Sequence, residues 1–451
     1  MSSNAQTQST IDASDGVSET RDLTYQQMIL CAAVIGIAGG LVASVYYYVL
    51  EACLHLVWHT IPEFLEPYFP ALLPSWNYVW IATTIGGFLV GLTLYLMGLP
   101  GEVAFVVDKV HSPGKIDLRQ TPAMIVASLV SITAGGSAGP EAPLVQVNGS
   151  FGSWLGEKLN LTMTTSRVLT LCGMSAALGA FFGAPLGGAL FALELPHRRG
   201  LEYYEAIVPA VLSAILSFFV FRSNTGLTIG GMYHFAAIPQ LSLINLGEGA
   251  LLGVLGALTA WLFVLMFRAI GHLSEYVAHR TIALATLGGL SIGLIALVFP
   301  QTLFFGEKEI NTIVDTGATF GIVMLLSIAL AKMLAVSCTL HSGFRGGFIF
   351  PLFYIGAAVG LAVSLAIPQI HPTIGMICMM AAVNVAITKT PVSTTVILSV
   401  LSDTAMVPVI VIASFVSFIL TTEVCLIKTQ RSRSSMTVEP RLPMQVVTKS
   451  A

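Results

Sequence analysis

Long apolar stretches, with few charges between them, limit what this chain can fold into more than any other feature. A membrane-spanning helix needs about 20 mostly apolar residues. Only 10% of the 451 residues are charged, whereas a soluble domain carries about 25%. A soluble enzyme and a nucleic-acid-binding protein are therefore excluded, and we expect an all-α polytopic protein embedded in a lipid bilayer. The stretches of sufficient length are about 27–57, 77–98, 203–222, 243–269, 281–300, 318–340 and 405–427.

Between these stretches lie apolar pieces that are short or interrupted, and each begins or ends near glycine or proline. A helix that begins inside a bilayer leaves backbone N–H groups that hydrocarbon cannot satisfy. Such helix ends are tolerated where they line a cavity or bind an ion, so the pattern predicts a transport protein. The pieces are 121–135, 142–158, 166–181, 185–195, 348–366, 372–387 and 391–402.

The spacing of helix-opening prolines indicates an internal repeat. Pro143 and Pro185 open apolar segments in the first half, and Pro351 and Pro391 open them in the second half. Matched broken helices that meet at a central site are the expected trace of inverted repeats. Chance spacing of prolines is the alternative.

The predicted organisation has four parts. Residues 1–26 are polar, without the basic start of a cleavable signal, and form a cytoplasmic N-terminal tail. Residues 27–222 and 223–427 form the first and second membrane repeats. Residues 428–451 are net basic, which predicts a cytoplasmic C-terminal tail without further domains.

Glu141 stands in the segment Gly139-Pro140-Glu141-Ala142-Pro143, between two apolar stretches. An ionisable residue at membrane depth is a functional candidate by default. Pro143 predicts a helix start, and the N–H groups of a helix N-terminus form an anion site. We expect the carboxylate to occupy that site and to leave it when protonated or displaced by an anion. The alternative is a surface glutamate that only complements a helix N-terminus.

A second Gly-rich segment, GGFIFP at 346–351, follows Lys332 and Arg345. Its glycines permit close backbone approach, and its proline predicts another helix start. The amides of Phe348 and Ile349 would hold an anion weakly, as conduction requires. A tightly packed helix start without a ligand is the other interpretation. Lys332 and Arg345 either raise the positive potential along an anion path or neutralise helix C-termini.

The chain resembles the CLC family of chloride channels and proton-coupled chloride exchangers. The residues Gly98-Leu99-Pro100 resemble the end of the family's GSGIP element, and 139–143 resemble GREGP. The stretch 144-LVQVNGSFG-152 is close to TVQIGGNIG, and 184-APLGGALFALE-194 resembles APLAGILFIIE. Residues 346–351 resemble GGIFAP, and the resemblance extends from about 27 to 427.

The resemblance implies inverted repeats of broken, tilted helices, in a homodimer with one anion pathway per subunit. It implies that Glu141 gates the pathway and that the anion is bound mainly by backbone amides. Chloride would be the transported ligand, with protons as a second partner in exchangers, and no cofactor, metal or catalytic residue is expected. The implied anion-binding residues are Met97, Gly98, Gly139, Pro140, Ala142, Gly347, Phe348 and Ile349.

The chain departs from the family at three places. Met97 stands where the family has an ion-coordinating serine, and a thioether has no O–H donor for an anion. Fluoride-transporting members share this methionine. The stretch 415–430 lacks the family's inner-gate tyrosine, and Leu195 stands where exchangers carry a second glutamate after Glu194.

We therefore expect anion transport gated by Glu141, through a voltage-gated or passive chloride channel because Leu195 favours conduction. A proton-coupled chloride or fluoride exchanger is the alternative. A membrane enzyme is disfavoured because the sequence has no HExxH motif, no paired intramembrane aspartates and no GxSxG followed by a suitable histidine. The termini, which lack CBS domains, resemble those of prokaryotic members, and this predicts location in the prokaryotic inner membrane.

Overall fold

The computed structural model describes residues 20–69, 76–98, 101, 103–227, 233–236, 241–402, 404–424 and 426–431. Within these ranges the protein is helical, and its extended pairs are two isolated bridges, Arg21–Leu161 and Gly139–Gly347. Most of the two predicted tails, and Leu99 and Pro100 of the first family landmark, lie outside the described residues.

The α-helices of the first half follow the predicted apolar segments closely. The short π-helix η1 (Leu56–Thr60) joins the first two of them. These helices are α1 Tyr25–His55, α2 Ile61–Leu65, α3 Trp76–Met97, α4 Val103–His111, α5 Thr121–Thr133, α6 Glu141–Lys158, α7 Met163–Phe182, α8 Pro185–Glu194 and α9 Ile207–Thr225.

The second half contains two long helices followed by shorter ones. Several of these helices begin at proline, for example at Pro372 and Pro391. Proline is favoured there because it lacks the N–H that a first-turn residue would leave unpaired. These helices are α10 Leu243–Glu275, α11 Thr281–Val298, α12 Glu307–Thr316, α13 Gly321–His341, α14 Ile349–Ala366, α15 Pro372–Thr388, α16 Pro391–Leu401 and α17 Val407–Leu420.

Eight helical segments of the described chain have the length and apolar composition to cross a membrane. Two of them, Met163–Phe182 and Ile349–Ala366, were predicted as short or interrupted pieces, and that prediction was wrong. Both are mostly buried within the protein, 94% and 78% of their apolar windows, so their glycines and polar residues serve helix packing. Conversely, the predicted span at 405–427 contains α17 of only 14 residues, because the chain turns after Leu420.

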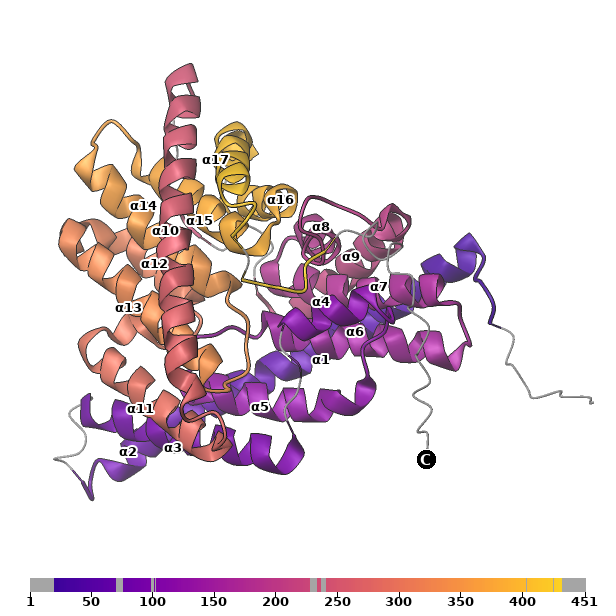
Figure 1. Cartoon of the computed structure of the whole chain (residues 1–451), viewed down its shortest axis with the longest axis horizontal. Helices are drawn as coiled ribbons and strands as arrows, with labels where there is room; N and C mark the ends of the chain where they lie inside the picture. The colour runs from indigo at the N-terminus through magenta and orange to yellow at the C-terminus, as the bar shows by residue number, and fades with distance from the viewer. Residues whose placement is uncertain are drawn as a thin grey trace, which may run out of the picture.

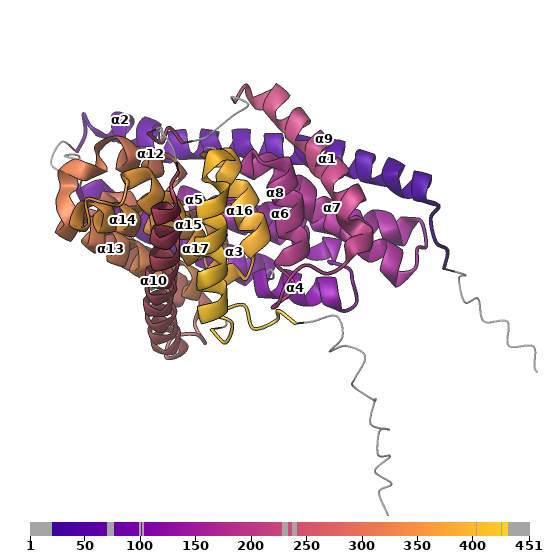
Figure 2. The same cartoon turned by 90° about the horizontal axis from the view of Figure 1, so that it is seen from above.

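The pattern of helix packing in the first half recurs in the second. Helix α7 packs on α6, α8, α9 and α1, and α15 packs on α14, α16, α17 and α10 in the same way. Figure 1 shows the first half (indigo to magenta) along the bottom and right, and the second half (salmon to yellow) on the left and top. Seen from above in Figure 2, α1 extends along one long side of the molecule.

The two halves are joined most closely by the pair α3–α11 and by the pair α8–α16. Between α3 and α11 the backbones approach through glycines. A Cβ at Gly87 would collide with the carbonyl oxygen of Ala285, and one at Gly289 with that of Thr83. Small residues provide the tight helix contacts that stabilise membrane proteins, where lipid gives no hydrophobic driving force.

The C-terminal segment 426–431 lies on the protein body. The side-chain amide of Gln430 donates to the carbonyl oxygens of Leu195 and Thr388, at 2.8 and 2.7 Å. The hydroxyl of Thr429 donates to Ala104 O at 2.7 Å. These contacts tie the end of the second half to α4, α8 and α15, so the start of the predicted C-terminal tail is a packed segment.

Candidate functional site

The two Gly-rich segments singled out in the sequence meet in space. Gly139 N donates to Gly347 O at 2.8 Å, and Gly347 N donates to Gly139 O at 2.6 Å. This isolated antiparallel bridge places the start of α6 beside the start of α14. Two helix N-termini from opposite halves of the chain therefore converge at one point, as expected for an anion site.

Glu141 is the first residue of α6, and its side chain is only 1% exposed. Its Oε1 accepts a hydrogen bond from the backbone N–H of Ile349 at 2.9 Å. The partner is thus α14, from the other half of the protein, and not the helix that Pro143 was expected to open. Oε2 is buried and has no hydrogen-bond partner in the described part of the chain.

Glycine is required on both sides of this carboxylate. A Cβ at Gly139 would overlap Oε2 of Glu141, and a Cβ at Gly347 would lie 2.5 Å from its Cγ and its Oε1. Real side chains do not tolerate such approaches, so a larger residue at either position would displace the carboxylate. The bridge therefore forms a pocket that fits the glutamate side chain closely.

A cavity of about 360 Å³ opens beside the bridge and is lined by Ala142 and Phe348. Its wall includes residues 340–346, which form the end of α13 and the segment that leads to α14, together with residues of α3, α4, α5, α6 and α10. Leu426 and Ile427 also line it. These two apolar residues belong to the stretch in which the family's tyrosine is missing, so the wall offers no hydroxyl group there.

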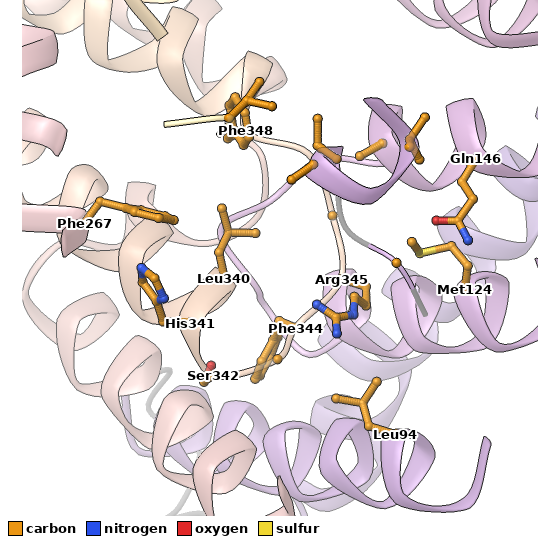
Figure 3. Close-up of a pocket in the computed structure, with 18 of the residues that line it drawn as sticks. Leu94, Met124, Gln146, Phe267, Leu340, His341, Ser342, Phe344, Arg345 and Phe348 are labelled. Carbon is orange, nitrogen blue, oxygen red and sulfur yellow. The ribbon is translucent and has the colours of Figure 1, made fainter. Parts of the chain in front are cut away.

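The polar side chains that line this cavity are chiefly Arg345, His341 and Gln146. Figure 3 shows the Arg345 guanidinium between Gln146 on α6 and the ring of His341. The backbone N–H of Arg345 donates to Ser131 Oγ at 2.8 Å, which fixes the segment against α5. Among the described lining residues there is no aspartate or glutamate, so the cavity favours anions over cations.

A second, smaller cavity of about 30 Å³ lies at Glu141, with Leu195 and Thr388 in its wall. It is otherwise lined by apolar side chains, including those of Val145, Leu178 and Phe191. Of the described residues that line it, only Glu141 is ionisable. Leu195, the apolar replacement noted in the sequence, therefore lies in the same cavity as Glu141.

The structure places the other predicted anion-binding residues as follows. Phe348 precedes α14 as its N-cap residue, and Pro140 precedes α6 in the same way. Met97 ends α3 with its side chain 45% exposed and is not among the described residues that line either cavity. Gly98 follows it with a left-handed φ of 85°. The roles of these residues in anion binding remain predictions.

The charged residues near the site have structural partners. Lys332 is fully buried and donates to the carbonyl oxygens of Thr302, Leu303 and Phe304, at 2.8–3.2 Å. Its ammonium group therefore pairs with the carbonyl oxygens of a chain turn, in keeping with the neutralising interpretation. Lys332 is not among the described residues that line either of these cavities.

Glu194 also connects the halves through a helix start. Its carboxylate accepts from the backbone N–H groups of Val392 and Ser393, at 3.1 and 2.8 Å, and from the Ser393 hydroxyl at 2.6 Å. A carboxylate at a helix N-terminus is stabilised by the helix dipole. Glu194 thus holds α16 as Glu141 holds α14.

The sequence reasoning missed Gln146. This residue is fully buried, and neither heteroatom of its carboxamide has a hydrogen-bond partner within the described ranges. Its position was predictable from helical spacing, because Ala142 and Gln146 are four residues apart and share a helix face. An amide in an otherwise apolar helix start was the available signal.

A sequence model of the family described as "Voltage gated chloride channel" matches residues 86–422. The chain belongs to this family, the CLC family. The matched range includes both Gly-rich segments and the bridge between them. The resemblance identified from the landmark motifs is thereby confirmed.

Individual relatives agree with this assignment. The chain is 28% identical over 378 residues to a "Chloride/fluoride channel protein" of Pseudomonas syringae pv. tomato, covering 82% of this chain and 81% of the relative. The fold of this chain is similar to that of a CLC-type fluoride/proton antiporter, with a TM-score of 0.73 and 20% identity. That match covers 91% of this chain and 100% of the antiporter chain. It is also similar to a slow cyanobacterial Cl−/H+ antiporter, with a TM-score of 0.75, 20% identity, and 88% and 95% covered.

These findings confirm the predicted fold class and the prediction of an integral multi-pass membrane protein. They also confirm the coarser functional prediction, anion transport of the CLC type. A bacterial relative that matches most of the chain supports the expected location in a prokaryotic inner membrane.

Proposed function

We propose that this CLC protein conducts chloride passively through a pathway in each subunit, with the Glu141 carboxylate as the gate. The observation that carries the proposal is the hydrogen bond from Ile349 N–H to Glu141 Oε1 at 2.9 Å. A backbone amide at a helix N-terminus is a general anion ligand. The carboxylate therefore occupies a place that a chloride ion would take.

Competition between the carboxylate and chloride follows from the space available. The bridge glycines Gly139 and Gly347 leave just enough space for the glutamate side chain, and the Ile349 N–H that would bind an anion already donates to its carboxylate. An arriving chloride must displace the side chain, or a proton must neutralise it first. Displacement breaks the hydrogen bond from Ile349, and protonation weakens it by removing the negative charge of the acceptor, so either event favours opening of the pathway.

Passive conduction is favoured over exchange by the small cavity at Glu141. A proton that crosses the protein needs a chain of groups that can carry it. Here the described wall of the cavity is apolar apart from Glu141 and Thr388, and Leu195 offers no carboxyl group. Glu141 is thus left without a described ionisable partner in this cavity.

A reconstitution experiment tests the proposal. Vesicles containing the purified protein are given a chloride gradient, and chloride efflux and internal pH are followed together. We expect chloride efflux without proton movement, and faster efflux for Glu141→Gln because a neutral amide competes poorly with chloride. Chloride-driven proton uptake by the wild type would refute passive conduction, and equal efflux from the variant would refute the gate.

Proton-coupled exchange of chloride or fluoride is the second candidate. Met97 is the observation in its favour, since it removes a hydroxyl donor that would suit chloride, and the similar proteins include a chloride/fluoride channel protein and a fluoride/proton antiporter. The same vesicles loaded with fluoride distinguish the two. Fluoride efflux that exceeds chloride efflux and moves protons would establish the exchanger, and Met97→Ser would then restore chloride transport.

We also propose the homodimer that the family resemblance implies, with a complete pathway in each subunit. Glu141, Ile349 and both cavities come from a single chain, so each subunit can conduct independently. The mass of the protein in detergent by light scattering tests the dimer. A monomeric mass with full transport activity would contradict it.

A further inference from the structure

Gln146 has an environment that a structural role does not explain. Its side chain is fully buried on α6, and both Oε1 and Nε2 lack a hydrogen-bond partner in the described part of the protein. Leaving a buried polar atom unpaired costs about 1–3 kcal/mol. Because Gln146 also lines a cavity, a molecule or ion that enters the cavity can pair with the carboxamide and offset this cost.

The surroundings of Gln146 identify what can enter. Its side chain lines the cavity of about 360 Å³, next to Ala142 in the first turn of α6. Figure 3 shows the carboxamide above Met124, with the Arg345 guanidinium lying between it and the ring of His341. A cationic group beside an uncharged N–H donor, with no carboxylate in the described lining, is an environment for a small anion.

We propose that the Gln146 carboxamide is an anion ligand within this cavity and determines which anion the pathway accepts. The inference rests on the proposed function and extends it to a second binding position. One N–H of the amide donates to the anion, while Arg345 supplies positive potential across the cavity. The position differs from the Glu141 seat, which is formed by a backbone amide of α14.

This ligand compensates for two features of the sequence. Met97 has replaced a hydroxyl donor, and 415–430, which contributes Leu426 and Ile427 to the cavity wall, lacks a tyrosine, so the pathway has lost two hydroxyl groups that the family resemblance implies. The Gln146 amide provides a donor that is neutral and held on a helix. A neutral donor binds an anion weakly enough to release it, as a conduction pathway requires.

Gln146→Met tests the proposal, because methionine has nearly the same length and shape but no N–H donor. Chloride efflux from vesicles is measured over a range of chloride concentrations, and chloride binding to the purified protein in detergent is measured by calorimetry. We expect about tenfold weaker chloride binding, the usual effect of losing a hydrogen bond to a charged group. We also expect a changed order of preference among fluoride, chloride, nitrate and bromide.

Asn148→Leu is the matched control. Asn148 lies two residues further along α6, is 1% exposed, and has both side-chain heteroatoms unpaired within the described ranges, but it does not line the cavity. The Asn148→Leu substitution should leave chloride binding and anion preference unchanged. A loss of stability common to buried amides would affect both variants alike.

Two results would overturn the inference. One is a chloride affinity within twofold of the wild-type value in both Gln146→Met and Gln146→Glu. The Gln146→Glu variant is measured at pH 8 to favour ionisation of the new carboxyl group. The other is a loss of chloride affinity in Asn148→Leu that is as large as the loss in Gln146→Met. Calorimetry separates this failure from failure of the proposed function, because chloride binding does not depend on transport. Wild-type protein that binds chloride through Gln146 but moves none in vesicles would refute conduction only.

Discussion

Replacing Gly347 by alanine should open the gate without altering the gating residue. The new Cβ would lie 2.5 Å from both Cγ and Oε1 of Glu141, and closer still to its carboxyl carbon. The backbone of Gly347 is not in the left-handed region, so alanine introduces no backbone strain there. The glutamate side chain must therefore leave its position.

The size of the effect follows from the bond that is lost. The seated carboxylate accepts a backbone hydrogen bond from Ile349, and a hydrogen bond to a charged group contributes about 1.5–3 kcal/mol. At 1.4 kcal/mol for each factor of ten, the seated population falls by about 10- to 150-fold. Chloride then meets an unoccupied amide in most molecules.

The assay is chloride efflux from vesicles at pH 7.5 and pH 5. Gly347→Ala should conduct faster than wild type at pH 7.5 and lose most of its dependence on pH, because the carboxylate no longer competes. Gly247→Ala is the control, since nothing lies within 4 Å of a Cβ at that position on α10. Wild-type efflux and pH dependence in Gly347→Ala would refute the steric reasoning.

Three further predictions concern stability. Lys332→Met should lower the free energy of unfolding by about 3 kcal/mol or more, because three backbone carbonyl oxygens, two of them buried, lose their donor. Denaturant titration in detergent measures this change. Glu194→Leu should cost about 2–4 kcal/mol by removing the contacts that hold the start of α16, measured in the same way. Burial lowers the pKa of His111, which is fully buried beside Pro196 and His197, to about 4. The unfolded chain therefore takes up this proton first, and the melting temperature should fall as the pH drops from about 6.5 toward 4.

Each of these predictions has a result that contradicts it. An unchanged unfolding free energy in Lys332→Met would mean that the carbonyl oxygens find other donors. Glu194→Gln, which keeps an acceptor oxygen, should be less destabilised than Glu194→Leu, and the reverse order would exclude the helix-start explanation. In His111→Gln the melting temperature should depend less steeply on pH between 6.5 and 4. An unchanged slope would assign this pH dependence to other groups.

Most helix boundaries could be predicted from the sequence because their signals are local. Proline fixes φ and lacks an N–H, so α8, α15 and α16 begin at Pro185, Pro372 and Pro391, where the apolar pieces were expected to open. The length of a helix is less local. Thr162 caps α7 and extends it to 20 residues, so that a piece predicted as short is long enough to span the membrane.

The candidate site was only partly predictable. Glu141 was identified because an ionisable residue in an apolar, helix-breaking segment is costly without a function. Its hydrogen-bond partner Ile349 lies 208 residues away, and no local pattern specifies that pairing. Helical spacing from Ala142 could have placed Gln146 on the same helix face, but the presence of Arg345 in the same cavity could not be predicted from either segment alone.

The sequence by itself determined the solvent, the helical class and the positions at which helices begin, because these depend on hydrophobicity, proline and glycine along short stretches. The tertiary structure alone decided which helix starts meet. The Gly139–Gly347 bridge, the seat of Glu141 and the cavity with Gln146 and Arg345 arise from packing between halves that are distant in the chain. Such contacts depend on the shapes of many side chains at once, so no single segment contains them.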